Sequence, residues 1–352
     1  MVRVSATSNS VSEGSKKPVI AIAGAGAIGC FVGGMMALGQ KDVRFLARPR
    51  IASMLLKHGL RITDFSGFDN RIAPAALKLS TDPSVFAEAD IILVTVKSGA
   101  TQQIAESIAE HAPNTAVVVS LQNGVSNADT LRAALPGRDV RAGMVAYNVI
   151  NAGDGRFHRG VSGKIVVEAG EGEIGKTIAA PHLDVFESSD MRAVQWGKLL
   201  INLNNALNAL SGRPLRDQVL DRDWRRIFAA QISEAMAALS AEGIEPRSAT
   251  PLPTKWLPAI MRLPTPLYKI IAARNLKIDP EARSSMWEDL QAGRKTEIDE
   301  LQGAVIKLCE KHGLTAPTCS RVMALIKECE TRAGGSPKLS PAEVRGGLDS
   351  TR

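Results

Sequence analysis

The sequence predicts two domains, an α/β domain built on a mainly parallel sheet and an all-helical domain that follows it. Up to about residue 189, short β-rich runs alternate with helical stretches, and from about residue 190 the chain is helical nearly throughout. The β-rich runs are continuously apolar, which is typical of strands that a parallel sheet buries on both faces. We therefore expect a disordered leader at 1–17, the α/β domain at 18–189, the helical domain at 190–332 and a flexible tail at 333–352.

The strands of the first domain are expected where an apolar run gives way to a helical stretch. They are 18–24, 42–48, 89–97, 115–123 and 140–150. The helical stretches between them are 27–39, 50–58, 99–111 and 125–134. Around 155–170 the run GRFHRGVSGKIVVEAGEG predicts a β-hairpin.

The second domain is expected to consist of five long helical stretches. These are 191–210, 216–242, 281–291, 297–313 and 318–332. A proline-rich stretch at 251–269 interrupts them, and it predicts either a long connection or a set of short helices. No internal repeat is evident.

Composition and charge limit the class of protein. The 352 residues are 45% hydrophobic, as in a globular protein with a substantial core, and the net charge is +7. Because basic residues are interspersed with acids, as in RDQVLDRDWRR, we expect no nucleic-acid partner. No window reaches the roughly 18 apolar residues of a membrane span, so we expect no membrane partner.

The cysteines and the first residues indicate a compartment. The four cysteines form no CxxC pair, so they are interpreted as reduced thiols of a cytosolic protein. The leader MVRVSATSNSVSEGSKK has no apolar core between its charges and is not interpreted as a signal peptide. We therefore expect a cytoplasmic protein.

The run GAGAIG, between the first expected strand and the helix behind it, predicts a Rossmann-type dinucleotide site. Gly24 permits a tight turn, Gly26 lets backbone N–H groups approach a pyrophosphate, and Gly29 permits close packing of the helix on the strand. Ala27 and Ile28 lie at the helix N-terminus, whose partial positive charge favours the phosphates. A plain tight turn is the alternative, and the strand–turn–helix context favours the cofactor site.

The end of the second strand predicts which dinucleotide binds. An NAD site needs an acidic residue there for the ribose 2′-hydroxyl, but the strand ends FLARPR, with Arg48 and Arg50 and no acid. Arginine pairs with phosphate and stacks on adenine. NADP(H) is therefore the expected cofactor, with Arg48 as its phosphate ligand. An exposed strand-end arginine is the alternative, and it has more weight for Arg50.

Polar residues follow two further strands at the edge where ligands of α/β sheets bind. The run IILVTVKS ends near Lys97, and VVVSLQNG ends in Asn123 and Gly124. Both Lys97 and Asn123 are expected to face the crevice, as cofactor-binding residues. A turn residue before glycine is the alternative for Asn123.

The chain resembles the ketopantoate reductases (2-dehydropantoate 2-reductases), within the 6-phosphogluconate-dehydrogenase-like superfamily. The resemblance covers about 18–330. It is carried by GAGAIG, VTVKS, LQNGV, WGKLLINLNNALNAL and SSMWEDLQAGRKTEID, of which the last two are the most specific. It implies an oxidoreductase that uses NADPH to reduce 2-dehydropantoate to (R)-pantoate, a step toward coenzyme A.

The resemblance also implies roles for individual residues. Lys198 corresponds to the general acid, and a lysine suits this role because its ammonium stabilises the charge that grows on the keto oxygen and donates the proton. Glu297 corresponds to the glutamate that accepts a hydrogen bond from the substrate's distal hydroxyl. Ser285 corresponds to the serine that binds the substrate carboxylate, and Asn123 is counted among the substrate ligands. Asn202, four residues after Lys198 on the same helical face, would bind the substrate or orient the lysine.

One position departs from the family pattern. Family members usually carry a second asparagine four residues after the first, and here that position is Ala206. Either Asn204, Asn205 or Asn208 replaces it through a local helix distortion, or one substrate contact is missing. Ala206 therefore keeps open a reductase of another 2-keto acid. A non-catalytic NADP(H)-sensing protein is a further alternative, and Lys198 and Glu297 count against it because a pure sensor needs neither. The expected partner is a small 2-keto acid, and a homodimer stays open.

The spacing of two implied ligands predicts a helix break. Ser285 and Glu297 would lie about 18 Å apart on one straight helix, too far for one small keto acid. Gly293 is a natural helix terminator, and Thr296 followed by Asp299 resembles a capping box. We therefore expect one helix to end near 291–294 and the next to start at 296–297, with Glu297 facing the cleft between the domains.

Overall fold

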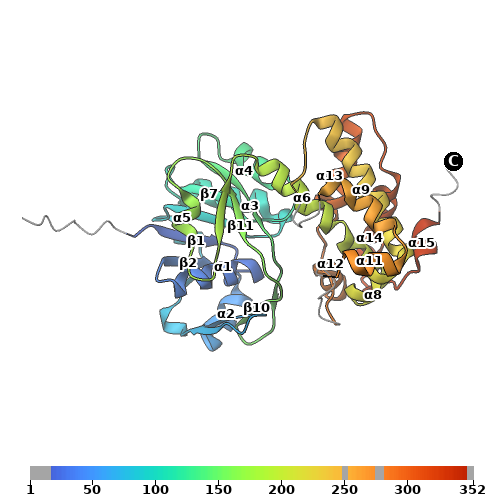
Figure 1. Ribbon diagram of the computed structural model, residues 1–352. Coiled ribbons are helices and arrows are strands. Elements are labelled where there is room, and N and C mark those ends of the chain that lie inside the picture. Colours follow the sequence, from blue (N-terminus) through green and yellow to red (C-terminus); the bar gives the residue numbers. More distant parts are fainter. Residues whose placement is uncertain (1–16, 248–252, 274–280, 347–352) are drawn as a thin grey trace, which may run out of the picture.

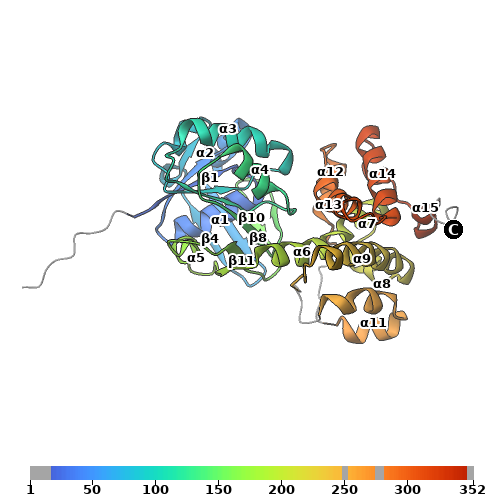
Figure 2. The ribbon, with the colours of Figure 1, turned by 90° about the horizontal axis from the view of Figure 1, so that it is seen from above.

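The computed structural model describes residues 17–247, 253–273 and 281–346, which form an α/β domain and a helical domain lying side by side (Figure 1). Helix α6 (Met191–Asn202) leads from the first domain into the second, and both views place it between them (Figures 1 and 2). The predicted leader, apart from Lys17, lies outside the described residues.

The main sheet of the α/β domain has eight strands in the order β12-β11-β8-β7-β6-β1-β2-β5. Six of them are parallel neighbours, from β8 to β5, while β11 runs antiparallel to β8 and parallel to β12. The strand bounds are β1 Val19–Ala23, β2 Asp42–Leu46, β5 Lys78–Ser80, β6 Ile91–Val94, β7 Val117–Ser120, β8 Val140–Val145, β11 Ile165–Glu168 and β12 Val185–Ser188. The predicted mainly parallel sheet is confirmed.

Helices cover both faces of this sheet because the central strands are apolar on both faces. Ile20 and Ile22 of β1 belong to the core on the α1 side, and Ala21 and Ala23 belong to the core on the α3 and α4 side. The helices are α1 Ala27–Leu38, α2 Pro49–His58, α3 Thr101–His111, α4 Asn127–Ala134 and α5 Ile174–Ile178, with short 3-10 helices η1 Pro74–Ala76, η2 Pro83–Phe86 and η3 Ser98–Ala100.

A second, four-stranded sheet was not predicted. Its strands are β4 Asp69–Ile72, β3 Leu60–Asp64, β10 Arg156–Arg159 and β9 Val149–Asn151, in that order. The predicted hairpin at 155–170 is therefore wrong: β10 pairs with β3 and β9, whereas β11 pairs with β8 and β12. Local alternation cannot distinguish these pairings, and burial decides them, because Phe157 packs with Leu60 and Ile62 of the small sheet.

The helical domain packs around the long helix α9 (Arg222–Glu242), whose Trp224 and Ile232 are buried in its core. The other helices are α7 Asn204–Ser211, α8 Leu215–Leu220, α10 Leu257–Arg262, α11 Thr265–Ile271, α12 Ser285–Gln291, α13 Ile298–Lys311, α14 Pro317–Arg332 and α15 Pro341–Arg345, with the 3-10 helix η4 Thr254–Trp256. The described part of the proline-rich stretch thus forms a set of short helices, the second of the two alternatives.

The C-terminal segment differs from the predicted flexible tail. Residues 333–346 include α15, which Ser340 and Glu343 start with a reciprocal capping box, and Val344 of this helix is fully buried in the helical core. The Leu339 N–H also donates to the Leu210 carbonyl oxygen, and Ser336 Oγ donates to the Ala209 carbonyl oxygen. Apolar and hydrogen-bonded contacts together therefore dock a segment rich in Gly, Ser and Pro. Residues 347–352 lie outside the described residues.

Two further predictions concern thiols and membranes. The four cysteines are free and buried. Among the residues that the structure describes, no helix is both long and apolar enough to cross a membrane.

Candidate active site

The glycine turn after β1 has the geometry of an anion site. Gly24 has φ +109°, and a Cβ there would lie 2.9 Å from the backbone N of Val96. A Cβ on Gly29 would lie 2.3 Å from the Gly24 carbonyl oxygen, whereas one on Gly26 would meet nothing within 4 Å. Only the first and third glycines are therefore demanded by packing, and the second leaves open space in front of the turn.

Helix α1 begins at this open space. Its N-cap, Gly26, provides no side-chain cap, so the N–H groups of the first turn, which starts with Ala27 and Ile28, have no partner within the helix. No acidic side chain occupies this turn. These backbone donors and the helix dipole fit the pyrophosphate of a dinucleotide.

The end of β2 also fits a phosphate. Arg48 is the N-cap of α2, and both Arg48 and Arg50 are exposed. Within the described part of the chain, neither guanidinium has a hydrogen bond or an ion pair. Arg48 is thus free to contact an anion beside the turn after β1, since β1 and β2 are neighbours.

Lys97, which follows β6, is tied to the helical domain. Its Nζ donates to Asp289 Oδ1 at 2.6 Å, and the same oxygen accepts from Arg294 Nε at 2.9 Å. The Asp289 side chain is only 9% exposed, whereas that of Lys97 is 52% exposed. An ammonium has three donors, so Lys97 keeps capacity for a further ligand in the crevice.

A row of hydrogen bonds joins Lys198, Asn123 and Glu297. Lys198 Nζ donates to Asn123 Oδ1 at 2.9 Å and to the Val145 carbonyl oxygen at 2.5 Å. Asn123 Nδ2 donates to Glu297 Oε2 at 2.8 Å. The row connects α6, the loop behind β7 and the start of α13, so both domains contribute to it.

Burial brings the pKa values of Lys198 and Glu297 closer together. It lowers the pKa of Lys198 from 10.5 to about 8, against the opposing charge of Glu297. It raises the pKa of Glu297 above its ordinary value, and the hydrogen bond from Asn123 opposes that change. An amine whose pKa lies near physiological pH can release and regain a proton readily, as a general acid must.

Close packing fixes Lys198 on α6. Residue 197 is glycine, and a Cβ there would lie 1.7 Å from the Arg247 carbonyl oxygen. The Arg247 N–H donates to the Ala193 carbonyl oxygen at 2.9 Å, so the chain after α9 crosses directly over α6. The backbone of Arg247 therefore packs against α6 at the residue next to Lys198 and fixes the position of the lysine Cα.

Of the asparagines that follow Lys198 in the sequence, some have side chains that are hydrogen-bonded within the protein and others have side chains that are free to bind a ligand. The Asn204 amide pairs reciprocally with Gln218 at 3.0 Å, and the Asn208 amide binds the Arg213 carbonyl oxygen and the Ser284 N–H. These two side chains are buried and engaged, which removes them as substitutes for the missing family asparagine.

Position 206 does not face the site. Helix α6 ends at Asn202 and α7 starts at Asn204, and Ala206 is fully buried in the helical core. Leu203 between the helices keeps helical angles (φ −55°, ψ −26°), so Lys198, Asn202 and Asn205 share one face at i, i+4 and i+7. The half-exposed amides of Asn202 and Asn205 have no hydrogen-bond partner among the described residues.

The predicted helix break between Ser285 and Glu297 is confirmed. Helix α12 ends at Gln291, Gly293 has φ +60°, and α13 starts at Ile298. Ser285 is exposed at the first residue of α12. Its neighbour Ser284 caps α12 and donates to the Asn205 carbonyl oxygen at 2.9 Å, which brings the start of α12 beside α7.

The predicted cap of α13 is wrong. The N-cap residue is Glu297, and Thr296 Oγ1 accepts from the Ile298 N–H at 3.2 Å while it donates to Glu330 Oε1 at 2.7 Å. Asp299 pairs with Lys327 on α14 instead of completing a capping box. Charged partners on α14 offer stronger hydrogen bonds than the local cap does.

Sequence reasoning missed two groups that shape the site. Asp289 lies four residues after Ser285 within the quoted SSMWEDL run, so helical spacing could have indicated it. The Val145 carbonyl oxygen, which accepts from Lys198, is a backbone group and has no side-chain signal.

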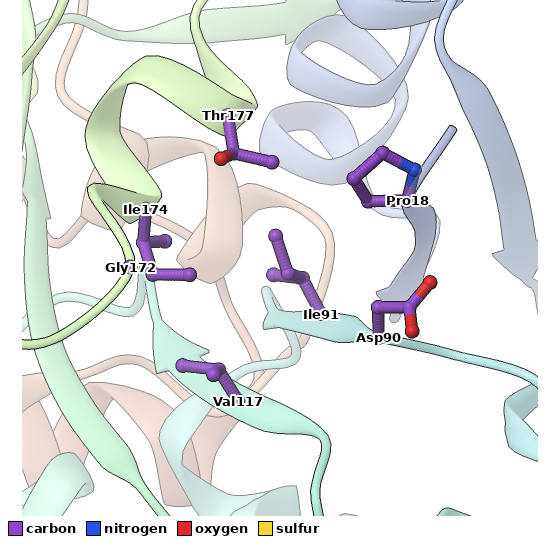
Figure 3. Close-up of a pocket in the computed structure, with 7 residues that line it drawn as sticks. All are labelled: Pro18, Asp90, Ile91, Val117, Gly172, Ile174 and Thr177. Atoms are coloured by element: carbon purple, nitrogen blue, oxygen red, sulfur yellow. The ribbon is translucent and has the colours of Figure 1, made fainter. Parts of the chain in front are cut away.

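A hollow elsewhere on the α/β domain does not belong to this site. It has a volume of about 310 Å³ and lies at the amino ends of the strands, between Pro18, Asp90, Val117 and helix α5 (Figure 3). The candidate site lies at the carboxyl ends of the same strands, where ligands of open α/β sheets bind.

Comparisons with known proteins match both domains. The family described as "Ketopantoate reductase PanE/ApbA" matches residues 20–172, and "Ketopantoate reductase PanE/ApbA C terminal" matches residues 190–330. A 2-dehydropantoate 2-reductase of Halobacterium salinarum is 26% identical over 318 residues, covering 88% of this chain and 97% of that protein.

Solved structures show the same fold. A PanE/ApbA family ketopantoate reductase from Ralstonia eutropha JMP134 is 31% identical, with a TM-score of 0.76, covering 89% of this chain and 99% of that one. D-mandelate dehydrogenase, solved with NADH and anilino(oxo)acetate, has a TM-score of 0.75 at 20% identity, covering 90% of this chain and 99% of that one. The fold is thus shared with an enzyme named for a different substrate.

Proposed function

Because this chain belongs to the ketopantoate reductase family, we propose that it reduces 2-dehydropantoate to (R)-pantoate with NADPH. The observation that carries the proposal is the hydrogen-bonded row of Lys198, Asn123 and Glu297. It brings an ammonium of lowered pKa and a carboxylate together at the carboxyl ends of the strands. A pure binding protein has no need of this pair.

The chemistry follows from what these side chains can do. Bound NADPH supplies a hydride to the keto carbon. Lys198 stabilises the negative charge that grows on the keto oxygen and donates a proton to it from Nζ, which leaves a neutral amine and an alcohol. Asn123 holds Lys198 and Glu297 in a fixed relation, and Glu297 accepts a hydrogen bond from the substrate's distal hydroxyl. Ser285 binds the substrate carboxylate.

The α/β domain would hold the cofactor. The backbone of the glycine turn (Gly24, Gly26, Ala27, Ile28 and Gly29) binds the pyrophosphate, for which the open space at Gly26 leaves room. The exposed Arg48 binds the 2′-phosphate, and Lys97 and Asn123 complete the cofactor-binding set.

A second candidate, a reductase of another 2-keto acid, is favoured by one observation. The family's second asparagine is replaced by the buried Ala206, so the helix face that contacts the end of the substrate away from the keto group carries different side chains. We assign the two amides of this face to Asn202 and Asn205, which lie on the same face as Lys198.

The test is turnover by the purified full-length protein with NADPH or NADH and a panel of 2-keto acids. We expect NADPH to give far better turnover than NADH, and 2-dehydropantoate to give the highest kcat/KM. A higher kcat/KM for another branched or hydroxylated 2-keto acid would favour the second candidate. NADPH binding without turnover of any member would contradict both.

A further inference from the structure

Three carboxylates of one segment of the helical domain bind the loops behind β6 and β7. The segment runs from α12 into the first turn of α13, and its partners come in the same order along the α/β domain. The pairs are Asp289 with Lys97 at 2.6 Å, Glu297 with Asn123 at 2.8 Å and Glu300 with Ser126 at 2.7 Å. The inner contact belongs to the site proposed above, and an outer contact flanks it on each side.

The contact between Glu300 and Ser126 is supported by a second observation. Gly124 lies between Asn123 and Ser126, and its φ is +86°. A Cβ on Gly124 would lie 3.1 Å from the Cβ of Glu300 and 3.3 Å from its carbonyl oxygen. The loop backbone therefore packs directly on Glu300. The hydrogen bond between Ser126 and Glu300 lies beside this close contact between the two domains.

The loop that carries Asn123 needs such a tether. Strand β7 ends at Ser120 and α4 starts at Asn127, so Asn123 lies in the irregular segment between them. Asn127 holds this segment from its own domain, donating to the Asn123 carbonyl oxygen at 2.6 Å. Glu300 holds it from the opposite domain by accepting a hydrogen bond from Ser126. Glu300 is one helical turn after Glu297, so the tether and the carboxylate move together.

We propose that Glu300, through its hydrogen bond with Ser126, is a positioning residue that fixes Asn123 against Glu297 and Lys198. This inference rests on the reduction proposed above. Catalysis by a preorganised row depends steeply on position, because a displacement of about 1 Å can lower a rate by up to roughly 10²-fold. In this role the tether acts only through Asn123 and needs no contact of its own with substrate or cofactor.

The experiment compares Ser126→Ala, Glu300→Ala and their double variant with the control Asp299→Ala. Asp299 lies in the same turn of α13, but its partner Lys327 belongs to its own domain. Ser126 makes no side-chain cap on α4, so its replacement removes only the tether. kcat, the KM for NADPH, the Tm and the NMR signals of the Asn123 side-chain amide are measured.

We expect each single variant to lower kcat by about three- to tenfold, and the double variant to lower it no further, because both lose the same hydrogen bond. KM for NADPH rises by a smaller factor than kcat falls, because the glycine turn and Arg48 are untouched. Glu300→Gln restores most of kcat. The Asn123 amide signals shift in Ser126→Ala, Glu300→Ala and the double variant, and stay in place in Asp299→Ala. Additive losses, or losses equal to that of Asp299→Ala, would overturn the proposal. An inactive parent would contradict the proposed function alone, and the Asn123 signals then decide the positioning role.

Discussion

The two domains place their site residues by different means. In the α/β domain every candidate residue follows a strand: the glycine turn follows β1, Arg48 follows β2 and Lys97 follows β6. In the helical domain the candidates come from helices: Lys198 and Asn202 lie in the last turns of α6, Ser285 starts α12 and Glu297 is the N-cap of α13. In a parallel sheet the topology brings the carboxyl ends of the strands to one edge. The ends of helices come together only where core packing and hydrogen-bond partners hold them.

This difference predicts separable tasks, the cofactor phosphates for the first domain and the proton for the second. The largest expected effect is that of Lys198→Ala, which removes the proposed proton donor. We expect kcat to fall by about 10²–10⁴-fold, the usual range for a lost general acid. Equal kcat in variant and parent, where chemistry limits the rate, would remove Lys198 from the mechanism.

In the α/β domain, Arg48→Ala should reduce the preference for NADPH over NADH. A lost charge-assisted contact to phosphate weakens binding by roughly 10–100-fold, so KM for NADPH should rise by that factor and KM for NADH should barely change. The matched control is Arg50→Ala, which removes the neighbouring exposed guanidinium. Equal use of both cofactors by the parent would contradict the role of Arg48.

Within the helical domain, variants at positions 205 and 206 test which side chain the helix interruption at Leu203 turns toward the site. We expect Asn205→Ala to lower kcat/KM for 2-dehydropantoate by roughly 2- to 10-fold, with little change for an analogue that lacks the distal hydroxyl. Ala206→Asn restores the family residue but puts an amide into the apolar core, so it should lower the Tm without raising kcat/KM. Improved turnover by Ala206→Asn would show that position 206 faces the site.

The last prediction of this series concerns pH. Burial lowers the pKa of Lys198 to about 8, so the protonated, donating form predominates below that pH and is lost above it. We expect kcat to be level below pH 8, to halve near it and to fall about tenfold for each further pH unit. A kcat that stays level up to pH 10 would contradict a general acid with this pKa.

The same difference decides what the sequence could predict. Continuous apolar strands and the run GAGAIG indicated the parallel sheet and the turn after β1, because burial on both faces and tight packing leave local signals. The small sheet and the docking of Val344 left none, because pairing partners and anchoring sites are set by distant residues. Residue resemblance indicated Glu297, and chain geometry indicated the break before it. The cap was wrong because Glu330 competes for Thr296.

The most direct test of separable tasks is the dissociation constant of NADPH, measured by fluorescence titration, for Lys198→Ala beside the parent. Lys198 lies on α6, and its partners are Asn123 and the Val145 carbonyl oxygen. The glycine turn and Arg48, which we assign to the phosphates, are not among them. We predict a Kd nearly unchanged from that of the parent, in a variant whose kcat has fallen by about 10²–10⁴-fold. A Kd that weakens in step with kcat would contradict the account.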